Sequence, residues 1–253
     1  MITGLEKFKE EFSGLEDQYV LIGGVAAYLV LDKAGIQPRA TKDLDIVLCM
    51  EALDADFGHT FWSFVKDGGY EIQQRSTGEK IFYRFSKPAA EAFPYMLELF
   101  SRAPDGMNPP AEMHLVPIPV ADEVYSLSAI LLDSDYYRFL HENKIEQGGL
   151  SIMNAEGLIP LKAKAWIDLT ERKSKGENVD SRDIKKHRSD ILRLYQLLNP
   201  DMRINTPDSI KADLNEFLDE LAQSDNINLG QIIGLKNVTR QSIIDMIKQV
   251  YQL

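Results

Sequence analysis

The side chains best suited to chemistry in this sequence are a glycine pair, Gly23 and Gly24, and two aspartates, Asp43 and Asp45. Glycines that end a short apolar run let backbone N–H groups approach a ligand, and a helix that begins there adds partial positive charge suited to a phosphate. The aspartates alternate with apolar residues, so in a strand both carboxylates point to one face. Their repulsion favours a divalent cation between them. Taken singly, the glycines also fit a plain turn and the aspartates a solvated strand end.

The flanking residues predict the elements that position these groups. Residues 19–22 form a β-prone apolar run and residues 25–31 a helix-compatible segment, so the glycines connect a strand to a helix. The aspartates begin a second apolar strand, and residues 32–38 predict an inserted loop before it. This order places a phosphate-sized turn and two carboxylates in one stretch of chain.

A third carboxylate, Glu98, interrupts the apolar strand expected at residues 93–101. An ionised carboxylate in such a run carries a large desolvation cost unless a cation or hydrogen-bond donors compensate it. The alternative is an edge strand that exposes Glu98 to water. We favour a metal site, with Glu98 as a third ligand beside the two aspartates.

A lysine, Lys162, occupies the centre of the apolar arc of a helix expected at residues 155–175, whereas Lys164 points almost opposite, beside Asp168. Burying an unpaired ammonium costs several kcal/mol, so Lys162 must reach an anion or a cleft. The alternatives are a buried acidic partner or a side chain that extends to solvent. Lys164 is expected to be an ordinary surface charge.

A polar stripe of Asp183, Lys186, His187 and Asp190 follows on the next expected helix, residues 181–198. These four positions are i, i+3, i+4 and i+7, and the stripe borders the apolar face of the helix. It fits either a functional surface or a pair of ion contacts worth a few tenths of a kcal/mol. The sequence leaves both interpretations open.

The order of these groups resembles the nucleotidyltransferase signature of the DNA-polymerase-β-like superfamily, and most of all its AbiEii-type toxin branch. The resemblance is carried by Gly23, Gly24, Arg39, Thr41, Asp43 and Asp45. It implies that the glycine pair binds the phosphates of a nucleoside triphosphate (NTP), that the two aspartates hold Mg²⁺ or Mn²⁺, and that Glu98 completes the metal site. The interval between glycines and aspartates is longer than in compact members of the family.

The resemblance covers the second half of the chain by arrangement only. In the related toxins, a lysine on one C-terminal helix and a basic–acidic cluster on the next face the nucleotide. The implied catalytic residues are Asp43, Asp45, Glu98 and Lys162. The implied nucleotide-binding residues are Gly23, Gly24, Arg39, Thr41, Lys162, Asp183 and Lys186.

Hydrophobic periodicity predicts an α+β fold, and the resemblance makes it a nucleotidyltransferase-type mixed β-sheet with flanking helices, followed by a mostly helical C-terminal bundle. We expect a nucleotidyltransferase core domain at residues 1–122 and a mainly helical domain at 123–253. The expected strands are 19–22, 43–48, 70–75, 80–85, 93–101, 114–120 and 126–132, with a hairpin loop at 76–79. The expected helices are 4–15, 25–31, 57–65, 134–143, 155–175, 181–198, 207–224 and 239–253, with caps at Asn154, Asp180 and Thr206.

Composition narrows the classes of partner. The 253 residues are 44% hydrophobic, enough for real cores, and carry a formal net charge of −11. That charge argues against broad binding to DNA, RNA or anionic lipid and against double-stranded DNA as a partner. A local basic patch at 182–188 is a candidate for RNA binding, but a charge run of this kind is more often a solvated helix face. The N-terminal residues lack a signal-peptide core and no apolar run spans a membrane, so we expect a cytoplasmic protein without a membrane partner. Cys49 is expected to be a buried thiol without chemistry.

These features predict a Mg²⁺-dependent nucleotidyltransferase that moves a nucleotide from an NTP to an acceptor. By resemblance the acceptor is RNA, in particular tRNA, or a protein hydroxyl, and the protein is a toxin or phage-defence effector with a cognate antitoxin as a candidate partner. Two alternatives stay open. An aminoglycoside-type small-molecule nucleotidyltransferase needs an acidic cleft for a cationic substrate, which the net charge suits. A non-catalytic member would only bind nucleotide or a partner.

Overall fold

The computed structural model describes residues 2–74, 80–105, 107, 115–118, 127–224, 227–234 and 238–253 of the chain. The expected hairpin loop at 76–79 and the ends of several expected strands lie outside these residues. The chain divides into two compact units. Unit 1 comprises Met1–Ala26, Ala40–Tyr137 and Lys144–Met153, and unit 2 comprises Ala27–Arg39, Arg138–Asn143 and Asn154–Leu253.

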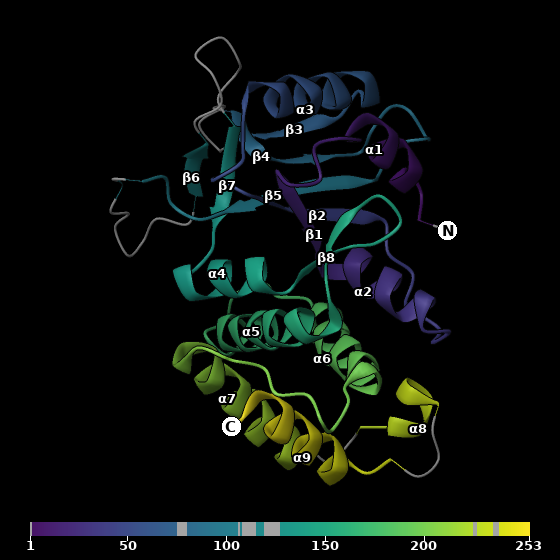
Figure 1. Cartoon of the computed structure of the whole chain (residues 1–253), viewed down its shortest axis with the longest axis vertical. Coiled ribbons are helices and arrows are strands. Elements are labelled where there is room, and N and C mark those ends of the chain that lie inside the picture. The colour runs from purple at the N-terminus through teal and green to yellow at the C-terminus, as the bar shows by residue number, and fades with distance from the viewer. Residues whose placement is uncertain are drawn as a thin grey trace. The chain divides into compact units, whose positions relative to one another are not determined.

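The described strands of unit 1 form one mixed sheet (Figure 1). Their order is β3-β4-β5-β2-β1-β9-β8, with β7 paired to β5 and β6 paired to β7. Neighbours are antiparallel except for three parallel pairs, β2 with β5, β1 with β9 and β5 with β7. The bounds are β1 (Tyr19–Ile22), β2 (Asp43–Leu48), β3 (Glu71–Gln74), β4 (Lys80–Ser86), β5 (Met96–Ser101), β6 (Leu115–Ile118), β7 (Leu127–Leu131), β8 (Lys144–Glu146) and β9 (Ser151–Met153).

Helices flank the sheet in unit 1 and make up most of unit 2 (Figure 1). Unit 1 contains α1 (Leu5–Glu11) and α3 (Ala55–Gly68), while α2 (Gly23–Lys33) and α4 (Ser134–Glu142) are divided between the units. Unit 2 contains α5 (Ala155–Ser174), α6 (Ser181–Leu194), the 3₁₀ helix η1 (Tyr195–Leu197), α7 (Asp208–Gln223), α8 (Leu229–Ile233) and α9 (Arg240–Tyr251). Within the described residues, no helix is both long and apolar enough to cross a membrane.

Aromatic side chains cover one face of the sheet. Rings from α1 and α3, which lie over this face in Figure 1, contact rings from the strands. The centroids of Phe8 and Tyr19 are 5.3 Å apart and those of Phe61 and Phe85 are 5.4 Å apart, both edge to face. All four rings are fully buried, so they contribute both apolar burial and favourable ring geometry to the core of unit 1.

Helix caps follow the sequence in two of the three expected places. The side chains of Asn154 and Asp180 accept backbone N–H groups at the starts of α5 and α6, as predicted. The cap expected at Thr206 is wrong, because α7 begins after Pro207, which has no side-chain acceptor. The Thr206 hydroxyl instead donates to the carbonyl of Ile204 at 3.1 Å.

The α+β class is confirmed, since a mixed sheet with flanking helices is followed by a mostly helical remainder. The division into units differs from a single cut after residue 122. β9 runs parallel to β1, with Leu21 beside Ile152, and this pairing returns residues 144–153 to the sheet. The sequence does not predict β8, β9 or α8, which span three, three and five residues and are too short to show periodicity. α2 also continues to Lys33, into the expected loop at 32–38.

Phe61→Ala should lower the free energy of unfolding by about 3–5 kcal/mol, because it leaves a cavity where a buried ring packs against Phe57 and Phe85. Ile145→Ala, at an exposed position of β8, should change it by less than about 0.5 kcal/mol. Urea unfolding followed by circular dichroism measures both. Similar effects from the two variants would show that the aromatic cluster is not the core of unit 1.

Candidate functional site

The carboxylates expected to act together lie on one face of the unit 1 sheet. β2 and β5 run parallel with Asp45 opposite Glu98, and Asp43 is two positions before Asp45, so the three residues share a face. The intervening Leu44 and Leu97 are fully buried on the other face, which the aromatic rings cover. The strand alternation thus separates a polar face from the core face.

Gly23 makes room for Asp45. Its backbone has a positive φ of 65°, which L side chains rarely adopt, and a Cβ atom there would lie 1.7 Å from Oδ2 of Asp45. β1 and β2 pair so that Ile22 lies opposite Asp45, and α2 begins at the next residue. The carboxylate therefore lies at the N-terminal end of α2, where unpaired N–H groups and the helix dipole stabilise negative charge. Gly24 belongs to the first turn of the same helix.

Arg84 compensates the charge of Glu98. It lies opposite Glu98 on β4, and its Nε donates to Oε1 of Glu98 at 2.7 Å, while Nη2 donates to the same oxygen. Burial alone would lower the pKa of Arg84, but the carboxylate of Glu98 more than offsets this and raises it. Glu98 is only 8% exposed. The cost of burying this carboxylate is therefore met by hydrogen-bond donors of the protein itself.

The donor chemistry of this face fits a divalent cation at the aspartate pair. Asp43 and Asp45 offer hard oxygen ligands on one strand face, and the phosphates of a substrate can supply the others. Across the described part of the chain, however, no three Asp, Glu, His or Cys side chains are grouped so that they could hold a metal ion. Glu98, the expected third ligand, is engaged by Arg84 instead. The three-ligand set stays a prediction.

Lys162 pairs with a buried acid in unit 2. Its Nζ donates to Oδ2 of Asp190 on α6 at 2.8 Å, and both side chains are 4% exposed. Arg39 and Arg193 approach the other oxygen of Asp190, at 3.4 and 3.9 Å. Burial raises the pKa of the Asp190 carboxyl, but the charges of Lys162 and Arg39 more than offset this and hold it below its usual value. Asp190 is thus a buried acidic partner of Lys162, which is one of the alternatives that the sequence analysis gives for this lysine.

Two other ion-pairing lysines of α5 and α6 are more exposed than Lys162. Lys164 is partly exposed and pairs with Asp168 at 3.2 Å, as the helical spacing predicts, and also with the less exposed Asp213 at 3.6 Å. Lys186 donates to Asp183 at 2.7 Å, with both side chains about half exposed. Such exposed pairs contribute only a few tenths of a kcal/mol.

His187 is half-buried, between the more exposed Asp183–Lys186 pair and the buried Asp190 of the stripe. Burial, followed by the charge of Lys162, lowers the pKa of His187 to about 4, so the imidazole is neutral at pH 7. Its Nδ1 atom is buried without a hydrogen-bond partner among the described residues. The stripe therefore divides into a more exposed ion pair, Asp183 with Lys186, a half-buried His187 and a buried Asp190.

The predicted site residues are distributed over both units. Those of unit 1 are Gly23, Gly24, Thr41, Asp43, Asp45 and Glu98. Those of unit 2 are Arg39, Lys162, Asp183 and Lys186. Within unit 1 the structure brings Gly23 to Asp45 and Asp45 to Glu98, and within unit 2 it brings Arg39 and Lys162 to Asp190.

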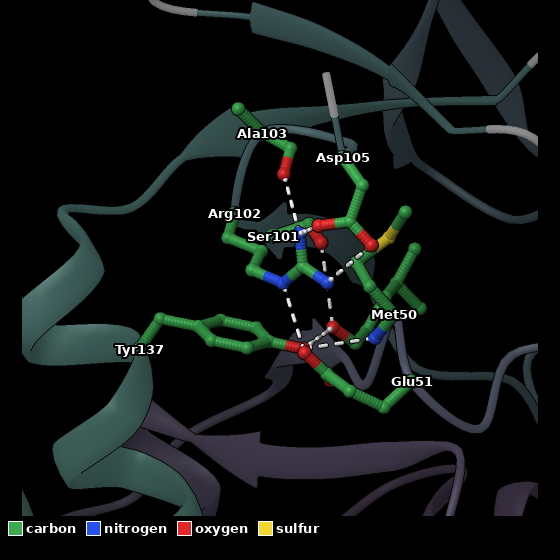
Figure 2. Close-up of polar contacts among 8 residues, drawn as sticks. Met50, Glu51, Ser101, Arg102, Ala103, Asp105 and Tyr137 are labelled. Carbon is green, nitrogen blue, oxygen red and sulfur yellow. Dashed lines mark hydrogen bonds and ion pairs between the residues drawn. The ribbon is translucent and has the colours of Figure 1, made fainter. Parts of the chain in front are cut away.

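A second polar network, which the sequence does not predict, lies at the ends of β2 and β5. Figure 2 shows the guanidinium of Arg102 beside Glu51 and Asp105, with bonds of 2.9 and 2.8 Å. The Tyr137 hydroxyl donates to Glu51 at 2.7 Å and accepts the Met50 N–H at 2.8 Å. Burial raises the pKa of Glu51, but Tyr137 and Arg102 more than offset this and lower it. The network links the segments that follow β2 and β5 to the first turn of α4 by hydrogen bonds.

Arg84 is the site residue that sequence reasoning missed. It stands among aromatic residues in β4, Phe82, Tyr83 and Phe85, just as Glu98 stands alone among apolar residues in β5. Two isolated opposite charges in consecutive strands are a signal for a cross-strand pair.

Lys162→Met should lower the free energy of unfolding by about 3 kcal/mol or more, because it leaves Asp190 buried without its nearest cation. Lys164→Met, on the same helix, should change it by less than about 1 kcal/mol, because Lys164 is partly exposed and its ion pairs are screened by water. Urea unfolding at pH 7 measures both. Equal losses would mean that the buried pair contributes no more than a surface pair.

His187→Gln should make stability less sensitive to acid. Because the folded pKa of His187 is about 4 and the unfolded value about 6.5, the unfolded chain binds more protons between these pH values, and stability falls as pH falls through this window. The variant should reduce the loss of unfolding free energy between pH 7 and 4 by up to about 3 kcal/mol. Denaturant titrations across this range measure the effect, with the exposed His59→Gln as control. An equal reduction in His59→Gln would contradict the assignment.

No protein-family model matches the chain, and no curated protein matches it in sequence. Solved structures that are similar to it include the following two. An antigenic nucleotidyltransferase-like protein from Paracoccidioides brasiliensis has a TM-score of 0.48 at 14% identity, with 100% of this chain and 99% of that chain covered. The antibiotic-resistance factor ANT(2'')-Ia has a TM-score of 0.38 at 13% identity, with 86% of this chain and 91% of that chain covered.

Proposed function

We propose that the chain is a nucleotidyltransferase that transfers a nucleotide from an NTP to an acceptor, with Mg²⁺ or Mn²⁺ as cofactor. The observation that carries this proposal is the placement of Asp43 and Asp45 on one sheet face, with Asp45 against the backbone of Gly23 at the start of α2. Carboxylates for a cation beside a glycine backbone for phosphates are a combination suited to metal-assisted nucleotidyl transfer.

Each residue of unit 1 has a distinct role in this proposal. Asp43 and Asp45 bind the cation, and the backbone at Gly23 and Gly24 holds the triphosphate. The bound cation supplies positive charge that stabilises the pyrophosphate leaving group. Thr41, half-buried just before β2, is proposed as a further nucleotide contact.

The roles in nucleotide binding expected for Arg39, Lys162, Asp183 and Lys186 rest on the family resemblance alone. For Lys162 that role competes with its bond to Asp190, at 2.8 Å. Binding a phosphate there would require Lys162 to share its ammonium between two anions, which its three N–H donors permit.

The acceptor proposed from the resemblance is RNA, in particular tRNA, or a protein hydroxyl, and the biological role is that of an AbiEii-type toxin or phage-defence effector with a cognate antitoxin. One observation favours a second candidate. The net charge of −11 suits a cationic small-molecule acceptor such as an aminoglycoside.

Incubation of the purified protein with each labelled NTP and Mg²⁺ tests the proposal and separates the acceptors. Parallel reactions contain total RNA, a protein extract or a set of aminoglycosides. Label in RNA or protein supports the first acceptor class, and label in an aminoglycoside supports the second. Absence of transfer to any of them would contradict a nucleotidyltransferase with these acceptors.

Asp43→Asn and Asp45→Asn should each abolish Mn²⁺ binding measured by calorimetry in the presence of NTP, because each removes one of two adjacent carboxylate ligands. Asp168→Asn, which removes an exposed carboxylate of unit 2, is the matched control and should leave binding unchanged. Circular dichroism should show that all three variants are folded. Undiminished binding in both site variants would exclude this metal site.

A further inference from the structure

Arg84 connects the carboxylate face to a third strand. The register places Arg84 of β4 opposite Glu98 of β5, and Glu98 opposite Asp45 of β2, so a cation and two carboxylates form a row across three neighbouring strands. Two guanidinium nitrogens of Arg84 donate to one oxygen of Glu98. The negative charge of Asp45 raises the pKa of Arg84 further.

We infer that Arg84 takes the place of a second metal ion, so that the site binds one divalent cation, on Asp43 and Asp45, and not two. This inference rests on the proposed function. Two-metal sites hold their ions about 3.5–4 Å apart and need enough carboxylates to share between them. Here the third carboxylate is Glu98, and the described residues contain no grouping of three potential ligands that could hold an ion.

Recruiting Glu98 to a metal ion would be costly. The ion would have to displace charge-assisted hydrogen bonds, which are about twice as strong as neutral ones, from a carboxylate that is 8% exposed. It would also leave the guanidinium of Arg84 close to a divalent cation, and like charges repel strongly where water is scarce. Arg84 and a second ion are therefore alternatives for the same carboxylate.

Arg84 can also perform the task of the missing ion toward a substrate. A guanidinium has five N–H donors, and only Nε and Nη2 are engaged by Glu98. The side chain is 41% exposed, so it is accessible to a ligand from solvent. A planar guanidinium binds phosphate oxygens in two-point contacts, which a lysine cannot reproduce. We assign to Arg84 the binding of triphosphate oxygens, with Glu98 as the residue that positions it.

The test counts Mn²⁺ ions bound per chain by electron paramagnetic resonance, with the protein saturated in turn by each of the four α,β-methylene nucleoside triphosphates. The wild-type protein should bind one ion. Arg84→Gln removes the guanidinium from Glu98 and should bind two Mn²⁺ ions. Glu98→Gln should still bind one Mn²⁺ ion. The matched control is Arg102→Gln, which breaks the ion pair of Arg102 with Glu51, also in unit 1. This variant should bind one Mn²⁺ ion per chain.

Two ions in the wild-type protein or in Arg102→Gln, or a single ion in folded Arg84→Gln, would overturn the inference and leave the proposed function standing. Loss of the ion in folded Glu98→Gln would identify Glu98 as a metal ligand and would also overturn the inference. The test therefore does not depend on Arg84→Gln alone. Circular dichroism establishes which variants fold. No bound ion in the wild-type protein would remove both the inference and the proposed function.

Discussion

Negative charge gathered on one sheet face must be compensated, and the polar side of unit 1 is organised around that constraint. The carboxylate of Asp45 lies against Gly23, where the start of α2 favours an anion and a Cβ atom would leave no room. Glu98 receives the guanidinium of Arg84. Asp43 lies on the same face at the first residue of β2. On the opposite face, aromatic rings of α1 and α3 pack against rings of β1 and β4 and form the core of unit 1.

In unit 2, too, a buried negative charge is compensated, here by an ion pair. Asp190 is enclosed on α6, and Lys162 from α5 supplies the nearest positive charge at 2.8 Å. Arg39 approaches from the segment after α2, so three separate parts of unit 2 converge on one carboxylate. The neighbouring His187 is neutral at pH 7 because its burial, and then the charges of Lys162 and Arg39, lower the pKa of its imidazole. This arrangement explains why a lysine can occupy the centre of a packed helix face.

The sequence predicts well what depends on local periodicity. The strand alternation that separates Asp43 from its apolar neighbours, and the helix faces that place Lys162 inside and Lys164 outside, follow from spacing alone. Register between strands is a different matter, because it depends on segments far apart in the chain. The pairing of Arg84 with Glu98 is of this kind. The hairpin of β8 and β9 is missed for another reason, since its strands are too short to show a pattern.

A crystal structure of the protein with Mn²⁺ and an α,β-methylene nucleoside triphosphate tests the central claim most directly. The account predicts an anomalous-scattering peak at coordination distance, about 2.1 Å, from carboxylate oxygens of Asp43 and Asp45, with the phosphates of the analogue on the same ion and beside Gly23. A metal ion bound away from both aspartates, or a nucleotide bound without contact to this face of the sheet, would contradict it.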